Sequence, residues 1–208
     1  MRPLASTPSL RKSLRQARRS LSPKARRQNE IRIAEALARH PLIQRSGTVA
    51  LYLSNDGEVD LALLLRYFLR KGKRVCLPVL RPGGGRRLWF APFAPGDALY
   101  LNRYGILEPD TRRHSPLKLR AIDAILMPLV GFDASMHRLG MGGGYYDRTL
   151  VPLKRSCWHR PRLIGVAHEC QRVGLLEVRP WDIPMDLVVT ELGPVLCRLP
   201  GGGPAAAR

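Results

Sequence analysis

The residues best suited to chemistry lie in one short segment that follows a strongly apolar stretch. The segment RLGMGGGYYDR, residues 138–148, contains four glycines, two arginines, two tyrosines and one aspartate. Glycines let backbone N–H groups approach an anion, and guanidinium groups add charge-assisted hydrogen bonds. Magnesium combines one or two carboxylates with phosphate oxygens, so an aspartate beside phosphate is a suitable ligand. The segment predicts a nucleotide phosphate site, with Arg138 and Arg148 as donors and Asp147 as the metal ligand.

Glycine content alone does not establish this site, because glycine-rich segments are also common as solvated turns. The segment matches neither G-x-x-x-x-G-K-[ST] nor G-x-G-x-x-G, so the standard phosphate-loop and dinucleotide classes do not apply. The combination of glycines, arginines and an acid directly after a buried strand nevertheless favours phosphate binding over a plain turn.

Six apolar runs indicate the scaffold that must position this loop. Strands are expected at residues 48–53, 74–77, 88–93, 121–127, 163–167 and 187–190. Helices are expected over residues 9–20, from Pro23 to a point before Pro41, and over residues 61–71. Ser22 and Asp60 should cap the second and third helices, and Gly72 should end the third. Alternating strands and helices predict an α/β fold with a largely parallel sheet, whose ligands bind beyond the carboxyl ends of the strands.

The chain has 208 residues, 45% of them hydrophobic, which suits one globular domain. We expect a flexible N-terminus over residues 1–8, a single catalytic domain over residues 9–192, and a disordered tail over residues 193–208. No apolar run is long enough for a membrane span or a signal peptide, so we expect a cytoplasmic protein without a membrane partner. The four cysteines lie far apart, which favours free thiols over a disulfide framework or a zinc site.

The formal net charge of +19 is the strongest compositional signal. A basic excess can mark nucleic-acid binding, but here it is scattered arginine without a nucleic-acid motif. We therefore do not expect nucleic acid as the main partner. Attraction of a polyanionic small substrate and the composition of the genome remain as alternative explanations.

Several separated blocks also resemble a known family. In chain order they are RKSLR, YLSNDGEVD, LPVL, GILEP, PLVGFD, RLGMGGGYYDR, GVAHECQ and PWDIPMD. Together they are similar to the 5-formyltetrahydrofolate cyclo-ligases over about residues 9–191. The resemblance implies a three-layer α/β sandwich related to sugar-phosphate isomerases and CoA transferases. It implies that 5-formyltetrahydrofolate and ATP react, with Mg²⁺, to give 5,10-methenyltetrahydrofolate, ADP and phosphate. The folate can carry a polyglutamate tail, and we expect a monomer.

The resemblance also implies roles for individual residues. Two stretches match ATP-binding positions: Arg11, Lys12, Ser13, Leu14 and Arg15, and then Arg138, Leu139, Gly140, Met141, Gly142, Gly143, Gly144, Tyr145 and Tyr146. Folate-binding positions match Asn55, Asp60, Met141, Gly142, Gly143, Gly144 and Tyr145. Asp147 and Asp186 match metal ligands, and Arg138 and Arg148 are the expected catalytic residues. The implied chemistry transfers the γ-phosphoryl group to the formyl oxygen, which needs positioning and charge neutralisation rather than a covalent nucleophile.

Each of these positions has a simpler structural interpretation. The first stretch resembles any solvated basic helix, Asp60 is a helix cap, and Asp186 has the place of an ordinary turn residue. Trp181 has the right chemistry to stack on the pterin, as has Tyr145, but core packing is the more common role of tryptophan. A different enzyme on the same fold, such as a sugar-phosphate isomerase, also remains open; it would consume no ATP.

One position departs from the family pattern. The pattern G-F-D-x-x-G-x-R-L-G has its second glycine where this chain has Met136. If the backbone there is left-handed, methionine costs about 1–2 kcal/mol, and glycine at this position should relieve that strain.

Overall fold

A central sheet of seven strands organises the protein, seen here in a computed structural model that describes residues 7–83, 85–111, 115–155 and 160–196. The strand order is β11-β10-β9-β6-β1-β2-β3. The strands are β1 Thr48–Ala50, β2 Arg74–Leu80, β3 Leu88–Phe93, β6 Ala124–Pro128, β9 Arg162–Val166, β10 Leu187–Thr190 and β11 Gly193–Pro194. Strands β2, β1, β6, β9 and β10 are parallel, and the two edge strands are antiparallel to their neighbours. The predicted, largely parallel sheet is confirmed.

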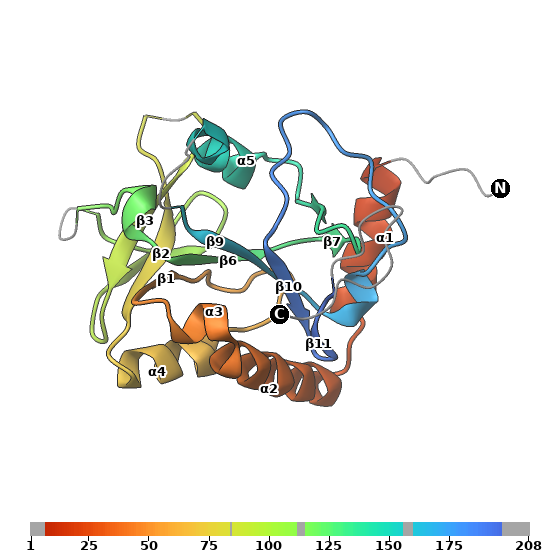
Figure 1. The fold of residues 1–208 in the computed structure, drawn as a ribbon, viewed down its shortest axis with the longest axis horizontal. Helices are drawn as coiled ribbons and strands as arrows, with labels where there is room; N and C mark the ends of the chain where they lie inside the picture. Colours follow the sequence, from red (N-terminus) through yellow and green to blue (C-terminus); the bar gives the residue numbers. More distant parts are fainter. Residues whose placement is uncertain (1–6, 84, 112–114, 156–159, 197–208) are drawn as a thin grey trace.

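Helices cover both faces of this sheet, which makes three layers (Figure 1). Helices α2 Pro23–Arg39, α3 Pro41–Gln44 and α4 Ala62–Arg70 lie on one face. Helix α5 Tyr145–Leu150 lies on the other face. No helix within the described ranges is long and apolar enough to cross a membrane.

Alternation along the strands creates two hydrophobic cores, one on each face. In β6, Ala124 and Leu126 belong to the core under α2 and α4. The intervening Ile125 and Met127 belong to the core under α5, together with Leu150. Because successive side chains of a strand point to opposite faces, a strand buried on both sides is apolar at every position. This accounts for the continuous apolar run that marks β6 in the sequence.

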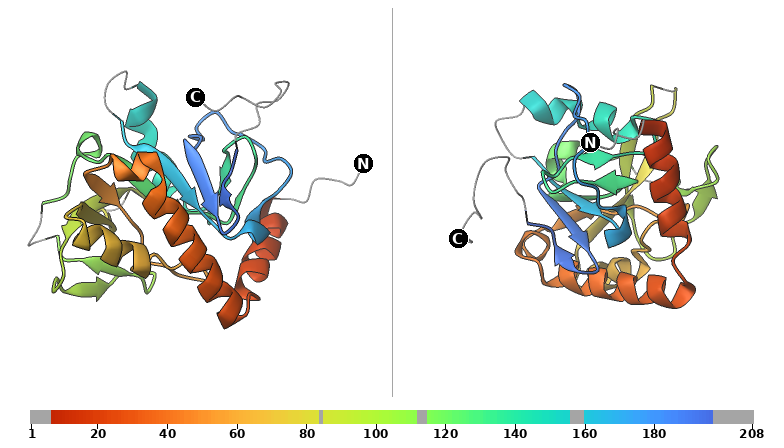
Figure 2. Two further views of the ribbon diagram at one scale, coloured as in Figure 1. Left: turned by 60° about the horizontal axis from the view of Figure 1, so that its bottom comes forward. Right: turned by 90° about the vertical axis from the view of Figure 1, so that its right-hand side faces the viewer.

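Helix α1 Thr7–Arg19 lies apart from both layers, beyond the carboxyl ends of the strands (Figures 1 and 2). It packs beside the short 3-10 helix η3 Glu169–Gln171, which follows β9. A small third cluster joins Leu14 of α1 to Val130 and Leu139. The helix therefore meets the sheet at the edge where ligands of α/β proteins bind.

Three of the four predicted helix boundary signals agree with the structure. Ser22 accepts a hydrogen bond from the Ala25 N–H at 3.2 Å, and α2 ends before Pro41. Gly72 after α4 has a φ of 68°. The N-cap of α4 is Leu61 rather than the predicted Asp60, whose carboxylate, one residue earlier, accepts the Ala62 N–H at 2.9 Å. Local chemistry therefore placed these boundaries to within one residue.

The strands differ from the prediction mainly in length. Strand β2 continues past Pro78 to Leu80, because it pairs with β3 as far as Leu80. Strand β1 pairs with it only as far as Cys76. Beyond that point β2 has a neighbour on one side only, where proline is tolerated. The sequence also missed three short pairings, namely β4 Leu99–Leu101 with β5 Leu107–Pro109, β7 Gly131–Phe132 with β8 Arg138–Leu139, and β11 with β10.

The predicted domain limits fall partly outside the structure. Residues 1–6 and 197–208 lie outside the described residues, so the expected flexible ends stay predictions, as does the relation to isomerase and transferase folds. At the C-terminal limit the sheet continues two residues further than expected, because β11 pairs with β10. Cys76 and Cys170 are free thiols, as predicted, and Cys157 and Cys197 lie outside the described residues.

Met136 adopts the left-handed backbone expected for the family glycine, with a φ of 65°. Asp133 builds this turn by accepting hydrogen bonds from the Ser135 and His137 N–H groups at 2.9 and 3.0 Å. The methionine side chain is 5% exposed and packs into the core under α5. The Met185 N–H also donates to the Met136 carbonyl at 2.9 Å. The chain thus accepts backbone strain at this position and gains a buried side chain.

This arrangement predicts that Met136→Gly destabilises the protein. Losing a buried methionine side chain costs about 2–5 kcal/mol, whereas glycine relieves about 1–2 kcal/mol of backbone strain. Urea unfolding of the wild type, Met136→Gly and Met136→Ala measures both contributions, because alanine loses the side chain and keeps the strain. We expect the order of stability to be wild type, then glycine, then alanine. A glycine variant more stable than the wild type would mean that strain outweighs packing.

Candidate functional site

The main pocket of the described residues has a volume of about 890 Å³ and lies where three segments meet. These segments are the N-terminal half of α1, the glycine loop between β8 and α5, and residues 173–182 before β10. The lining includes Arg11, Arg138, Gly140, Gly142, Gly144, Asp147 and Arg148 from the predicted site. Arg11 of α1 and the residues from Arg138 to Arg148, at least 127 positions later in the chain, therefore meet at the expected edge of the sheet.

Glycine is required in the loop by both conformation and space. Gly142 and Gly144 have φ values of 96° and 66°, which side chains rarely adopt. A Cβ atom on Gly144 would also lie 2.7 Å from Nη1 of Arg148. The absence of side chains lets that guanidinium fold back over the loop, where its Nη1 donates to the Gly143 carbonyl at 2.7 Å.

Two pocket arginines bind loop carbonyls rather than carboxylates. Nε of Arg11 donates to the Gly140 carbonyl at 2.9 Å, and Arg148 donates to Gly143 as described. Neither arginine forms an ion pair within the part of the chain that the structure describes. A carbonyl holds a guanidinium in place without neutralising it, so both positive charges remain available to an anion in the pocket.

Arg138 has a different arrangement, because it is nearly buried and ion-paired. Its guanidinium binds the Asp147 carboxylate and the Ile183 carbonyl, and its side chain is 7% exposed. The Asp147 side chain is 31% exposed and lines the pocket. Arg138 therefore orients Asp147, whose oxygen Oδ2 has no protein partner among the described residues.

The segment before β10 supplies the apolar wall of the pocket. Trp181 is 56% exposed and lines the pocket, and Arg179 lies over its ring at 5.7 Å. The more common core role of tryptophan is therefore wrong for this residue. Asp182, which the sequence reasoning did not select, also lines the pocket and accepts a hydrogen bond from the Arg179 N–H at 2.9 Å.

Asp186 does not line this pocket. Its carboxylate binds Arg160 at 2.7 Å and Arg162 at 3.4 Å, and it accepts the Leu163 N–H at 2.8 Å. Within the described ranges, no group of three or more His, Cys, Asp or Glu side chains is placed to hold a metal ion. The structure thus brings Asp147, but not Asp186, to the glycine loop.

The five predicted ATP-binding residues of α1 lie in different surroundings. Arg11 lines the pocket, Lys12 and Ser13 are exposed outside its lining, and Leu14 is buried. Arg15 donates to the Asp56 carboxylate at 2.7 Å. Of the five residues, only Arg11 reaches the pocket directly.

The predicted folate-binding residues of the turn after β1 bind backbone groups. The Asn55 side chain accepts the Asp56 N–H at 2.8 Å, and Asp60 accepts the Ala62 N–H. Neither residue lines the main pocket. Tyr145 also lies outside that lining, and its hydroxyl receives a hydrogen bond from Arg103 Nη2 at 2.8 Å.

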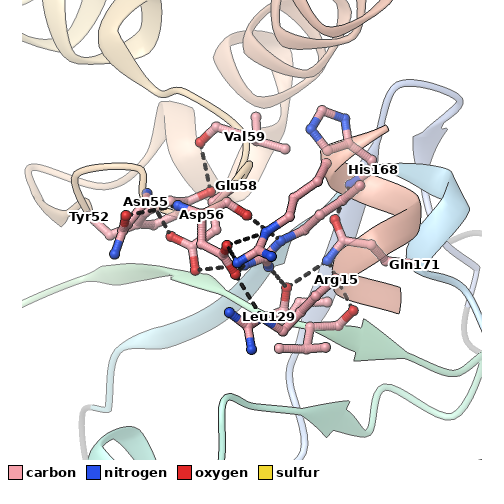
Figure 3. A network of polar contacts seen from close by, with 12 residues as sticks. Arg15, Tyr52, Asn55, Asp56, Glu58, Val59, Leu129, His168 and Gln171 are labelled. Carbon is pink, nitrogen blue, oxygen red and sulfur yellow. Dashed lines mark hydrogen bonds and ion pairs between the residues drawn. The ribbon is translucent and has the colours of Figure 1, made fainter. Parts of the chain in front are cut away.

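One carboxylate in the same turn gathers three arginines of α1 (Figure 3). Asp56 binds Arg15 at 2.7 Å, Arg18 at 3.0 Å, and Arg19. Burial alone would raise the pKa of Asp56, but hydrogen bonds from Arg15 and Arg19 and the charge of Arg18 lower it from 3.8 to about 2. This cluster could not be predicted from the sequence, because an acid in a polar turn and arginines on a basic helix are both ordinary features.

Glu58 lies behind the same cluster and is mostly buried. Its Oε1 lies 3.7 Å from Arg18 Nη2. Burial raises the pKa of Glu58 from 4.5 to about 7, although Arg18 opposes this shift. A carboxyl group that titrates near neutral pH therefore sits between the sheet and α1.

A parallel sheet with a basic glycine loop beyond its strands defines the chain as an α/β enzyme. A model of the 5-formyltetrahydrofolate cyclo-ligase family matches residues 3–191. The 5-formyltetrahydrofolate cyclo-ligase of Escherichia coli K12 is 41% identical over 177 residues, which cover 85% of this chain and 96% of the relative.

Solved structures agree with this relationship. The structure of Aquifex aeolicus 5,10-methenyltetrahydrofolate synthetase matches with a TM-score of 0.77 at 32% identity, covering 97% of this chain and 96% of that chain. A 5,10-methenyltetrahydrofolate synthetase from Mycoplasma pneumoniae matches with a TM-score of 0.70 at 25% identity, covering 89% and 99%. The chain belongs to the 5-formyltetrahydrofolate cyclo-ligase family and is a ligase.

The raised pKa of Glu58 predicts a pH-dependent stability. The unfolded carboxyl ionises above pH 4.5, but the folded one ionises only near pH 7, so stability falls as the pH rises through this range. Glu58→Gln has no carboxyl group to ionise and so escapes this loss of stability. The difference in the free energy of unfolding between the variant and the wild type should grow by up to about 1.4 kcal/mol for each unit that the pH rises between 4.5 and 7. Urea unfolding across the range tests this, with the exposed Glu35→Gln as the control. Parallel stability profiles for Glu58→Gln and the wild type would contradict the assignment.

Proposed function

We propose that this protein is an ATP-dependent 5-formyltetrahydrofolate cyclo-ligase that acts as a cytoplasmic monomer. It would convert 5-formyltetrahydrofolate and ATP to 5,10-methenyltetrahydrofolate, ADP and phosphate. The observation that carries the proposal is the glycine-loop pocket, where Arg11 and Arg148 keep their charge beside the oriented Asp147. Family membership supports the folate substrate, and the pocket supports the nucleotide.

The chemistry explains why such a pocket suffices. A formamide is a poor electrophile, and its oxygen is a poor leaving group. Transfer of the ATP γ-phosphoryl group to the formyl oxygen makes that oxygen part of a phosphate. The second folate nitrogen then attacks the formyl carbon, and the C–O bond breaks to release phosphate. Charge neutralisation and alignment dominate phosphoryl transfer, so Arg148 and the loop N–H groups are the catalytic groups we propose to act on the phosphates directly. Arg138, predicted as the second catalytic arginine, would act through the Asp147 carboxylate that it binds.

The donor set fits Mg²⁺ bound mainly through the nucleotide. Asp147 presents one unpartnered oxygen to the pocket, and magnesium commonly takes one or two carboxylates with phosphates and water. Glu177 and Asp182 are two further acids in the lining. When bound, the ion would neutralise phosphate charge; Asp147 would hold it, and Arg138 would hold Asp147 in place.

An aromatic group outside the pocket lining suits the folate. Tyr145, the first residue of α5, bonds to Tyr104 through their hydroxyls at 2.7 Å, and Arg103 lies over the Tyr104 ring at 5.1 Å. Tyr104 and Arg103 come from the turn between β4 and β5, and both are exposed. Aromatic faces next to an arginine offer surfaces for an aminobenzoyl group and for glutamate carboxylates.

The proposed activity is tested by following the absorbance of the methenyl product. Product should form only when 5-formyltetrahydrofolate, ATP and magnesium are all present, and ADP should appear in equal amount. Product formation without ATP, or no product at all, would refute the proposal.

Asp147→Asn should greatly raise the magnesium concentration required for turnover, because an amide is a poorer ligand than a carboxylate. Asp186→Asn is the matched comparison, since the structure surrounds that carboxylate with Arg160 and Arg162. We expect Asp186→Asn to lower stability and leave the magnesium dependence unchanged. An altered magnesium dependence in Asp186→Asn would instead support the second predicted metal ligand.

Arg103→Ala should reduce the preference for folates with long glutamate tails. We expect the KM for a triglutamate to rise about two- to fivefold at low salt, with a smaller change for the monoglutamate. The effect should shrink as salt is added, because exposed charges are screened within about 8–10 Å. Arg70→Ala, on α4, is the control. Equal effects of Arg103→Ala on both substrates would remove this arginine from the tail site.

A further inference from the structure

Helix α1 has little apolar surface with which to hold its position. Leu14 is its one buried apolar residue, with Leu10 partly buried beside it. An isolated helix of 13 residues is marginal in water, and a basic helix gains nothing from approaching other arginines. Something other than hydrophobic burial must therefore fix α1 against the rest of the protein.

The polar contacts of Arg18 supply this attachment; Figure 3 labels their partners Asp56 and Leu129. Its side chain is fully buried, and it donates to the Asp56 carbonyl at 2.9 Å, the Asp56 carboxylate at 3.0 Å and the Leu129 carbonyl at 3.1 Å. Arg15 and Arg19 bind the same carboxylate from either side of Arg18. Glu58 is a more distant carboxyl group, with its Oε1 3.7 Å from Arg18 Nη2, so Asp56 is the counter-charge that contacts all three arginines at this end of α1.

Arg11 lies on α1 as well, one turn before Arg15. Residues 11, 15 and 18 are spaced by four and three, so they share one face of α1. Two of them are fastened to Asp56, and the third donates to the Gly140 carbonyl at 2.9 Å and lines the pocket. Fixing Arg15 and Arg18 thus sets where Arg11 meets the glycine loop.

We propose that Asp56 is a positioning residue for nucleotide binding: it fixes α1 so that Arg11 completes one wall of the phosphate pocket. Asp56 does not itself line that pocket, so its influence passes through the helix. This inference rests on the proposed function, because it takes the glycine-loop pocket as the ATP site.

The experiment measures nucleotide affinity directly and so does not depend on turnover. MgATP is titrated into the wild type, Asp56→Asn, Arg11→Ala and the double variant by calorimetry without folate. We expect Asp56→Asn to weaken ATP binding about tenfold, the size of one lost charge-assisted hydrogen bond. In the Arg11→Ala background the same substitution should add less than about twofold, because residues that act as one unit are not additive.

Asp123→Asn is the control for a merely structural effect. Asp123 accepts hydrogen bonds from the Gly47 and Thr48 N–H groups at 2.8 Å each, at the amino ends of β1 and β6. Its loss should lower the melting temperature without changing ATP affinity at a temperature where both variants are folded. If Asp123→Asn weakens ATP binding as much as Asp56→Asn does, positioning by Asp56 is refuted.

Arg19→Gln keeps the inference testable if Asp56→Asn does not fold. Arg19 is about half exposed and binds Asp56 without lining the pocket. Its loss should weaken ATP binding about two- to fivefold, again only when Arg11 is present. Unchanged ATP affinity in Asp56→Asn would overturn the inference, and so would unchanged affinity in Arg19→Gln if Asp56→Asn does not fold. The proposed function would stand in that case, and it fails separately if the wild type makes no methenyl product.

Steady-state kinetics give a second, independent readout. A positioning role predicts that Asp56→Asn raises the KM for ATP while kcat at saturating ATP stays within about twofold, because ATP itself can draw α1 into place. A fall in kcat with an unchanged KM for ATP would contradict this role, since it would place Asp56 in the chemical step.

Discussion

The site depends on one buried positive charge, the guanidinium of Arg18. Taking an unpaired charge out of water costs several kcal/mol, so a buried arginine requires partners for its donors. Those partners are the Asp56 side chain and carbonyl and the Leu129 carbonyl. They come from the turn after β1 and from the end of β6, so this one side chain joins α1 to two neighbouring parallel strands. Gln171 also donates to the Leu129 carbonyl, at 2.6 Å, which ties η3 into the same arrangement.

Two different kinds of interaction hold the two parts of this protein in place. The sheet and the helices α2 and α4 are held by apolar burial, which is insensitive to salt and to direction. Helix α1 is held mainly by hydrogen-bonded charges, which are directional and set its orientation as well as its distance. A pocket wall that must place one guanidinium beside a loop carbonyl benefits from directional attachment more than from a larger apolar area.

The sequence was informative where local chemistry determines the outcome. Ser22 and Gly72 act within their own turns, and the glycine loop is recognisable because its conformation needs residues without a Cβ. The roles of Arg18 and Asp56 depend on a contact across 38 positions, and no local pattern distinguishes them from solvated residues. Met136 is a similar case. The left-handed backbone expected at this position is present, but the burial of the methionine side chain depends on the surrounding core and could not be predicted locally.

Two acids before β10 lie in different surroundings, which the sequence does not reveal. Asp186 directly precedes β10, but arginines beside β9 occupy its carboxylate. Asp182, four residues earlier, lies in a turn that returns to the glycine loop and lines the pocket. The family resemblance of the block PWDIPMD assigns Asp186 as a metal ligand, whereas Asp182 is the acid of this block that lines the pocket. Which acid lines the pocket depends on the path of a loop, which tertiary contacts determine.

The large positive charge has at least two distinct uses in this fold. Arg15, Arg18 and Arg19 share the Asp56 carboxylate, which holds α1 in place but offsets only part of their charge. Arg11 and Arg148 meet carbonyls, which fix their geometry but leave their charge uncompensated. The type of partner therefore separates structural arginines from those that attract an anion. Because a cleft concentrates the potential of uncompensated charges, the second group would raise the local concentration of the nucleotide that the proposed function requires.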